Sequence, residues 1–217
     1  MNGGDIRAFS RETVQGRGVG EGKVTPEIGG SGAYAHVRVA VEALSRGRGN
    51  IFSWDAGSVI PARFAAAVVR GIDDVVRGGV LAGFELVDVH VSVKDGSYHE
   101  EDSSSDAFRE AAREALTQAL QEAGPLILEA YSTVRAIVPA TLSAAVQAVM
   151  GSQSGEAVQS ETRFHAITAN TPAAQVDGLI RNLLAVTGGV GQITYSHGGF
   201  RLATEPPDIV EVRVPLR

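Results

Sequence analysis

The chain has 217 residues, of which 44% are hydrophobic and none is cysteine, and its formal net charge at pH 7 is −6. The acidic balance disfavours a general nucleic-acid binder, and the missing cysteines exclude disulfides, thiolate catalysis and cysteine-based zinc sites. No apolar run approaches the about 20 residues of a membrane span, and the N-terminus carries no signal-peptide core, so we expect a cytoplasmic protein without membrane contact.

The first half of the chain predicts alternating strands and helices. Period-two patterns, helical spacing and turn residues give, in order, a strand over 6–14, a glycine-rich loop over 17–32, a strand over 36–44, a turn over 45–50, a short strand over 51–53, a helix over 61–77 and a strand over 84–93. Asp95-Gly96 predicts a turn that ends the last strand. An alanine-rich helix over 104–123 follows a capping box at Ser103 and Asp106 and stops at Gly124-Pro125.

Gly124-Pro125 also marks the predicted domain boundary, which divides the chain into 1–124 and 125–217. The second part predicts a strand over 126–138, a helix over 140–150, a polar segment over 153–159, a strand over 162–169, a helix over 173–186, a turn over 188–191 and a strand from 192. With the polar segment as a strand, this order resembles the ferredoxin-like βαββαβ pattern. The fold class expected for the whole chain is α+β in two domains.

The predicted loop after the strand over 84–93 contains Ser97, Tyr98, His99, Glu100, Glu101 and Asp102. An aromatic and a histidine in such a loop suit stacking and hydrogen bonding to unpaired RNA bases, although spacing alone favours a solvated turn. The three carboxylates fit acid–base chemistry or a hard cation, but negative charge at a helix N-terminus explains them better. Tyr34 and His36 are explained equally well by a second functional loop and by local packing.

Other candidate sites are poorly supported by the pattern. His90, His165 and His197 lack the spacing of metal ligands. The glycines at 188–191 follow a predicted helix, whereas a phosphate-binding loop precedes one. No Gly-x-x-x-x-Gly-Lys-Ser/Thr motif is found, since Gly22-Lys23 is followed by Val24. We therefore expect no catalytic residue, metal, cofactor or DNA partner.

Several segments together resemble a known family. Residues 96–104 are GSYHEEDSS and residues 123–129 are AGPLILE, and further matches are the Arg-Glu-Thr at 11–13, GGSGAYAHV at 29–37, GSVIP at 57–61, GVLAG at 79–83 and LLAVTGGVGQIT at 183–194. These segments resemble domains IV and V of elongation factor G and related translational GTPases, which include the tetracycline ribosomal-protection proteins. The resemblance implies a ribosomal-S5-like domain followed by a ferredoxin-like domain.

The resemblance also implies a function. Two loops would form the tip of domain IV, which enters the decoding-side A site of the small ribosomal subunit during translocation, close to ribosomal RNA, tRNA and mRNA. The implied tip residues are Gly29, Gly30, Ser31, Gly32, Tyr34, His36, Ser97, Tyr98, His99 and Glu100. The energy for movement would come from a GTPase domain in cis or in trans.

The chain departs from the family pattern at several positions. Ser31, Leu184 and Val190 replace arginines, Ala35 replaces a glycine, and 150–153 lacks the usual arginine-rich turn. Each missing arginine removes a candidate phosphate contact, mostly in the second domain. A non-catalytic ribosome-binding part of a translational GTPase is the function expected. The alternatives are a stand-alone paralogue or part of a ribosomal-protection protein with a different partner, and a small-metabolite enzyme, which no motif supports.

Overall fold

The computed structural model describes residues 10–25, 33–151 and 163–203, and the backbone of 154–158. The described chain forms two compact units, each with its own hydrophobic core. The N-terminal unit is Ser10–Leu128 with Leu202 and Ala203, and the C-terminal unit is Glu129–Arg201. The predicted α+β class is confirmed, whereas the domain bounds 1–124 and 125–217 stay a prediction.

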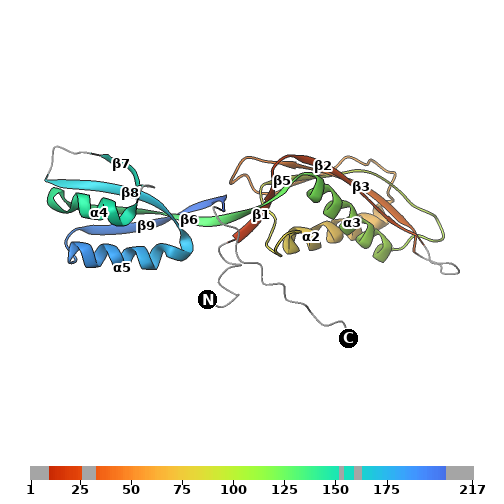
Figure 1. Ribbon diagram of the computed structural model, residues 1–217. Coiled ribbons are helices and arrows are strands. Elements are labelled where there is room, and N and C mark those ends of the chain that lie inside the picture. The colour runs from red at the N-terminus through yellow and green to blue at the C-terminus, as the bar shows by residue number, and fades with distance from the viewer. Residues whose placement is uncertain (1–9, 26–32, 152–153, 159–162, 204–217) are drawn as a thin grey trace, which may run out of the picture. The chain divides into compact units, whose positions relative to one another are not determined.

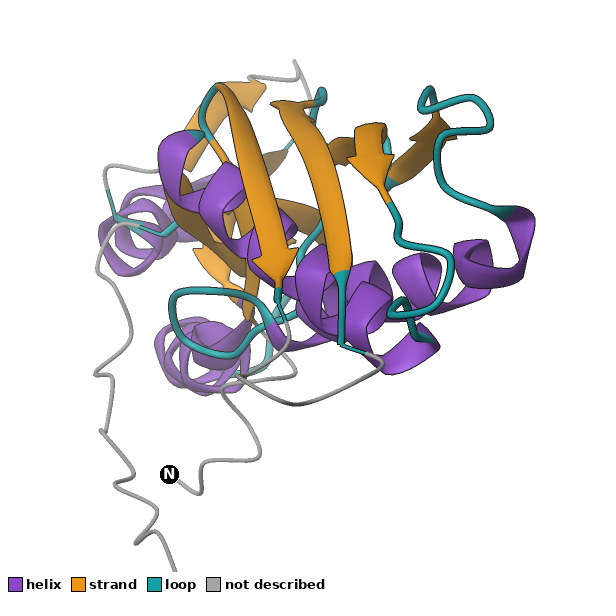
Figure 2. Cartoon of the chain, turned by 90° about the vertical axis from the view of Figure 1, so that its right-hand side faces the viewer, coloured by secondary structure: helices purple, strands orange, loops and turns teal. Residues whose placement is uncertain are grey.

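The N-terminal unit is a sheet covered on one face by two helices (Figures 1 and 2). Its elements are β1 (Ser10–Val14), β2 (Arg17–Val24), β3 (Ala35–Ala43), β4 (Ile51–Trp54), α2 (Ala62–Gly78), β5 (Val89–Ser97) and α3 (Ser105–Glu122). The sheet has the strand order β2-β3-β5-β4, in which only β4 and β5 run parallel. The core lies between sheet and helices, where alternate valines of β3 and β5 meet α2 and α3, and the rings of Phe64 and Phe108 stack at 4.6 Å.

The prediction of a loop over 17–32 is wrong for residues 17–24, which form β2; residues 26–32 lie outside the described part. The glycines serve a close approach between backbones rather than a flexible loop. A Cβ built on Gly18, Gly20 or Gly22 would overlap the carbonyl oxygens of Ala119, Ala115 and Ala111, respectively. Glycine at every second strand position therefore lets α3 lie directly on β2.

Helix α3 also satisfies the free edge of β2. The backbone N–H groups of Val19, Glu21 and Lys23 donate to side-chain oxygens of Glu122, Gln118 and Glu114, respectively, at 2.8, 3.3 and 3.2 Å. An uncovered edge strand presents such unpaired groups to other chains, so these long side chains cap the edge from within the molecule.

Strand β5 differs from its predicted limits at both ends. It begins at Val89, because Asp88 has a positive φ of 58° and accepts hydrogen bonds from the amides of Gly47 and Gly49. It continues through Asp95-Gly96, where the sequence predicts a turn, to Ser97. Gly96 is required because a Cβ there would lie 2.6 Å from the carbonyl oxygen of His36.

The capping prediction for α3 is wrong by one residue. The N-cap is Ser104, whose hydroxyl accepts from the Ala107 amide at 3.2 Å. Ser103 instead accepts from the His99 amide at 2.8 Å. The second serine therefore starts the helix, and the first closes the loop before it.

A buried carboxylate organises the loop before β5. Glu12 of β1 is fully buried, and its two oxygens accept hydrogen bonds from the amides of Val80, Leu81, Ala82 and Phe84 at 2.6 to 3.1 Å. Burial of a carboxylate is tolerated only when its oxygens are paired in this way. The 79–83 segment therefore has a fixed shape although it is neither helix nor strand.

The C-terminal unit has the predicted βαββαβ order. Its elements are β6 (Pro125–Pro139, which begins in the N-terminal unit), the 3-10 turn η1 (Ala140–Leu142), α4 (Ser143–Met150), β7 (Ser154–Val158), β8 (Phe164–Pro172), η2 (Ala173–Gln175), α5 (Val176–Thr187) and β9 (Gln192–Leu202). Strand β8 pairs with β7 and β6, and β9 also pairs with β6. This arrangement is ferredoxin-like, and it includes the strand expected in the polar segment. Within the described residues, no helix combines the length and apolarity needed to cross a membrane.

The contact between β2 and α3 predicts that Gly20→Ala destabilises the N-terminal unit by at least about 3 kcal/mol, the upper part of the range for overpacked sites. Besides the overlap with Ala115, the new Cβ would lie 2.6 Å from the amide nitrogen of Ala119, and neither backbone atom can move freely. Urea unfolding followed by the fluorescence of Trp54, the only tryptophan, measures the effect. Gly16→Ala is the matched control, because its Cβ would meet only Ala123 at 3.8 Å. Equal unfolding midpoints for the two variants would contradict the close packing of β2 on α3.

The buried carboxylate predicts a second effect on stability. Glu12→Gln keeps one acceptor oxygen but turns an NH₂ group toward amide donors, which should cost roughly 3 kcal/mol. Urea unfolding by Trp54 fluorescence again measures it. The control is Glu85→Gln, since that side chain is 54% exposed and pairs with Arg11 at the surface. If the urea midpoint of Glu12→Gln lay as close to the wild-type midpoint as that of Glu85→Gln does, the four amides would not need the carboxylate.

Candidate functional site

Two loops meet at one end of the N-terminal sheet. One leads into β3 and contains Tyr34, and the other joins β5 to α3. The Tyr34 amide donates to the carbonyl oxygen of Asp102 at 2.7 Å, and Tyr34 forms a parallel bridge with Ser103. The structure thus brings Tyr34 together with the predicted loop of Ser97, Tyr98, His99 and Glu100. Gly29, Gly30, Ser31 and Gly32 lie outside the described residues. We call the residues 34 and 97–104 the tip.

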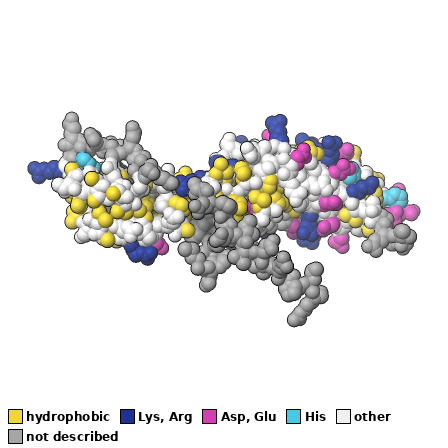
Figure 3. All heavy atoms as spheres, in the orientation of Figure 1, with side chains coloured by type: hydrophobic (Ala, Val, Ile, Leu, Met, Phe, Trp, Pro, Cys, Tyr) yellow, Lys and Arg dark blue, Asp and Glu magenta, His cyan; other side chains and the backbone are white. Residues whose placement is uncertain are grey.

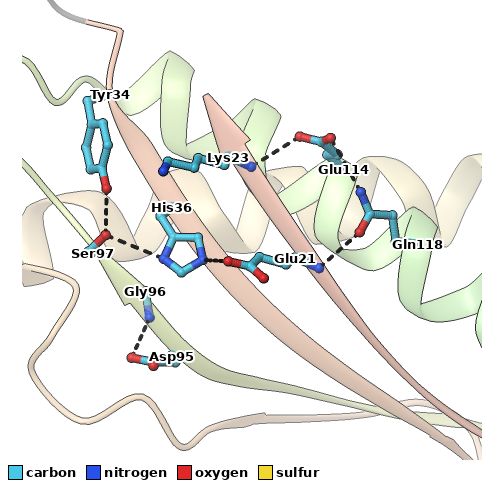
Figure 4. Close-up of polar contacts among 9 residues, drawn as sticks. All are labelled: Glu21, Lys23, Tyr34, His36, Asp95, Gly96, Ser97, Glu114 and Gln118. Carbon is cyan, nitrogen blue, oxygen red and sulfur yellow. Dashed lines mark hydrogen bonds and ion pairs between the residues drawn. The ribbon is translucent and has the colours of Figure 1, made fainter. Parts of the chain in front are cut away.

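A chain of polar contacts connects the base of the tip to the sheet (Figure 4). The Tyr34 hydroxyl lies 2.8 Å from Ser97 Oγ, which lies 3.4 Å from Nδ1 of His36. His36 Nε2 lies 2.6 Å from Glu21 Oε1. Both ring nitrogens of His36 are therefore engaged, and its side chain is only 19% exposed. Of the two explanations for His36, this placement favours local packing.

These residue types also occur in hydrolytic triads, but their geometry here is that of a structural chain. The Ser97–His36 contact is long, and the Ser97 hydroxyl has a closer partner in Tyr34. The neighbouring Gly96 amide, a candidate oxyanion donor, donates to the Asp95 side chain at 2.8 Å. The arrangement therefore supplies rigidity, and its geometry does not favour a hydrolytic site.

The loop between β5 and α3 is held by its own hydrogen bonds. The His99 amide donates to Ser103 Oγ, and the Ser103 amide donates to the His99 carbonyl oxygen at 3.1 Å. Ser104 then caps α3 directly after this closed segment. The backbone at 99–103 is consequently fixed at both ends, which is the condition for presenting a side chain in one position.

The side chains at the apex of the loop are accessible. Tyr98 is 44% exposed, and the His99 side chain is 59% exposed with Nδ1 3.0 Å from Asp102 Oδ2. Glu100 is exposed as well. A partner approaching this end of the sheet would meet these side chains before it met Tyr34, Ser97 or His36.

The tip is acidic. Figure 3 shows Asp and Glu side chains around a histidine at this end of the N-terminal unit, and the described acidic residues there are Asp95, Glu100, Glu101, Asp102 and Asp106. They outnumber the exposed Lys23 of β2, which lies opposite His36 in the sheet. The nearest lysine in sequence, Lys94, donates to Asp55 at 2.6 Å and by this hydrogen bond lowers the pKa of Asp55 below its usual value. Such a surface suits contacts to bases and ribose better than contacts to phosphates.

The remaining candidates lie elsewhere. His90 contacts Ser53 Oγ at 3.0 Å on the sheet, and His197 packs edge-on against Phe200. Gly188 is the left-handed C-cap of α5, which agrees with a turn. No group of three His, Asp or Glu side chains suitable for a metal ion occurs in the part of the chain that the structure describes.

Sequence reasoning misses two partners, Glu21 and Asp102. Glu21 falls in a predicted loop, and its alternation with the glycines of β2 is the signal that could have placed it on a strand. Asp102 is explained from the sequence only as charge near a helix end, although its spacing of three residues from His99 permits the contact.

Comparison with known proteins gives one consistent result. Residues 9–124 match the family model "Elongation factor G, domain IV". An elongation factor G from Aquifex pyrophilus is 34% identical over 202 residues, which cover 91% of this chain and 29% of that protein. A crystal structure of a protein from Thermus thermophilus superposes with a TM-score of 0.76 at 30% identity, covering 90% of this chain and 30% of the other. The chain thus spans less than a third of the length of these relatives.

The polar chain under the tip predicts that Tyr34→Phe lowers the stability of the N-terminal unit by about 1 kcal/mol, the usual net value of one hydrogen bond. The hydroxyl is lost, and Ser97 keeps only its long contact to His36. Tyr98→Phe is the control, because that ring is exposed and should change stability by less than about 0.5 kcal/mol. Urea unfolding by Trp54 fluorescence compares the two. A larger loss for Tyr98→Phe than for Tyr34→Phe would contradict the assignment of roles.

Proposed function

The chain belongs to the elongation factor G family, and we propose that it binds the ribosome through the tip of its domain IV. In this proposal Tyr98, His99 and Glu100 enter the decoding region, at the A site of the small ribosomal subunit, during translocation. The single observation that supports it most is the exposed His99 on a loop whose backbone is closed by Ser103 and anchored to Tyr34. The partners are ribosomal RNA and the neighbouring tRNA and mRNA.

The proposed mechanism is steric and needs a stiff support. The tip is anchored to three strands through the contacts of Glu21, His36 and Ser97, and to α3 through the Ser104 cap. A loop fixed in this way can occupy space and resist displacement without folding on contact, so little binding energy is lost in ordering it. Residues 34, 36 and 97 hold the tip, while residues 98–100 contact the partner.

The chain itself is proposed to be non-catalytic and to act in the cytoplasm. The family model matched by 9–124 is that of domain IV, and the sequence contains no phosphate-loop motif. The energy for movement would therefore be supplied by a GTPase domain in cis or in trans. The same proposal assigns residues 1–124 to domain IV and residues 125–217 to domain V.

A second candidate function is supported by the C-terminal unit. Leu184 and Val190 replace family arginines, and both are about half exposed, at 48% and 52%. Apolar surface where the family carries phosphate-binding charge favours a partner other than ribosomal RNA for this unit. A paralogue or ribosomal-protection protein with such a partner would keep the domain IV tip and lose the ribosomal contact of domain V.

Co-sedimentation of the full 217-residue chain with bacterial 70S ribosomes tests the proposal. His99→Ala should weaken binding about five- to tenfold, as expected for truncation of one central contact side chain. The slope of binding against salt concentration should stay the same, because the acidic tip releases no counterions from phosphates. His197→Ala serves as the control, since it removes a histidine from the other unit.

Three results would count against the proposal. They are absence of wild-type binding at low salt, equal binding by wild type and His99→Ala, and a loss of fold in His99→Ala seen by Trp54 fluorescence. The last would mean that His99 is structural.

A further inference from the structure

The pair His99–Asp102 has a feature that the proposed function does not by itself require. Asp102 Oδ2 lies 3.0 Å from Nδ1 of His99, and the other ring nitrogen, Nε2, has no hydrogen-bond partner among the described residues. Tyr34 binds only the backbone carbonyl of Asp102, so the carboxylate is not needed for that contact. The hydrogen bond on one ring nitrogen decides which nitrogen of a neutral histidine carries the proton.

We propose that Asp102 is a positioning residue, which holds the proton of His99 on Nδ1 and turns Nε2 outward as a hydrogen-bond acceptor. This inference rests on the proposed function and adds the chemistry of the group that His99 meets. That group is a neutral hydrogen-bond donor of RNA, either a ribose 2′-hydroxyl or an exocyclic base amino group. A phosphate oxygen, which only accepts, does not fit.

The surroundings of His99 disfavour a phosphate as its partner. Glu100, Glu101, Asp102 and Asp106 outnumber Lys23 at this end of the molecule, and the surplus of negative charge repels phosphates. The backbone of 99–103 is closed by the two hydrogen bonds between His99 and Ser103, so the carboxylate faces the ring in a preformed geometry. A single exposed hydrogen bond would be weak, but a fixed loop removes much of the entropy that such a contact usually costs.

The first measurement is the tautomer of His99 by ¹⁵N NMR of the imidazole nitrogens in the full chain at pH 7.5. Wild type should show the proton on Nδ1, and Asp102→Ala should move it to Nε2, which a histidine side chain without a partner prefers. Glu101→Ala is the matched control. It removes one negative charge from the residue beside Asp102 but leaves the Asp102 carboxylate, which contacts His99, in place. His99→Ala assigns the signal among the five histidines. An Nε2–H tautomer or a doubly protonated ring in wild type, or no change in Asp102→Ala, would overturn the inference.

The second measurement is binding of the same variants to 70S ribosomes. Asp102→Ala should weaken binding by a factor close to that of His99→Ala, and the double variant should lose no more than either one, because both act through one contact. Glu101→Ala should bind like wild type. Additive losses would show that Asp102 contacts the partner itself and does not act through His99.

Chemical footprinting on the ribosome identifies the donor. If the donor is a ribose 2′-hydroxyl, wild type should protect that hydroxyl from an acylating reagent and His99→Ala should not. If the donor is a base amino group, wild type should protect the base from a methylating reagent and His99→Ala should not. If wild type fails to bind ribosomes at all, the proposed function and the RNA donor fall together, while the NMR result still decides whether Asp102 sets the tautomer.

Discussion

The contact of a glycine strand with an alanine helix is the constraint on which the N-terminal unit depends. Glycines at every second position of β2 face alanines at every fourth position of α3, at a separation that leaves no room for a Cβ. Two strand residues advance about 6.7 Å, and four helical residues advance about 6 Å. The two repeats nearly match, so three successive contacts stay in register along the strand and the helix. The same closeness brings the side chains of Glu114, Gln118 and Glu122 within reach of the amides of β2.

The tip inherits its position from this contact. Helix α3 starts one residue after Ser104, where the loop of His99 ends, so a helix fixed against β2 also fixes that end of the loop. Strand β2 carries Glu21, whose carboxylate holds the ring of His36 under Tyr34 and Ser97. Both β2 and α3, which pack on each other, thus support the exposed side chains of the tip. A substitution far from the tip, at a glycine of β2, acts on both supports at once.

Periodicity predicts most of the fold and fails where tertiary packing overrides local preference. Strand β3, helix α2, helix α3 and the βαββαβ order are all evident from apolar spacing, because each buries one face. Strand β2 escapes prediction because glycine usually marks flexibility, whereas here it marks close approach to α3. The glycine at 96 misleads the prediction for the same reason. Composition and family resemblance identify the site loop, but the pairs His36–Glu21 and His99–Asp102 depend on strand register and loop closure, which no local pattern encodes.

If the tip binds the ribosome as proposed, its charge distinguishes two contributions to binding, attraction over a distance and discrimination on contact. Attraction to RNA over a distance comes from positive charge, and the tip has a surplus of carboxylates on a chain whose net charge is −6. In the proposed role, the tip therefore contributes discrimination through shape and hydrogen-bond direction rather than general affinity. Discrimination of this kind requires that the acceptor point in one direction before contact, since an imidazole free to exchange its proton between two nitrogens would also present a donor at Nε2. A negatively charged loop that fixes one tautomer of its histidine, as proposed for His99, is consistent with that requirement, whereas a basic loop would gain affinity and lose discrimination.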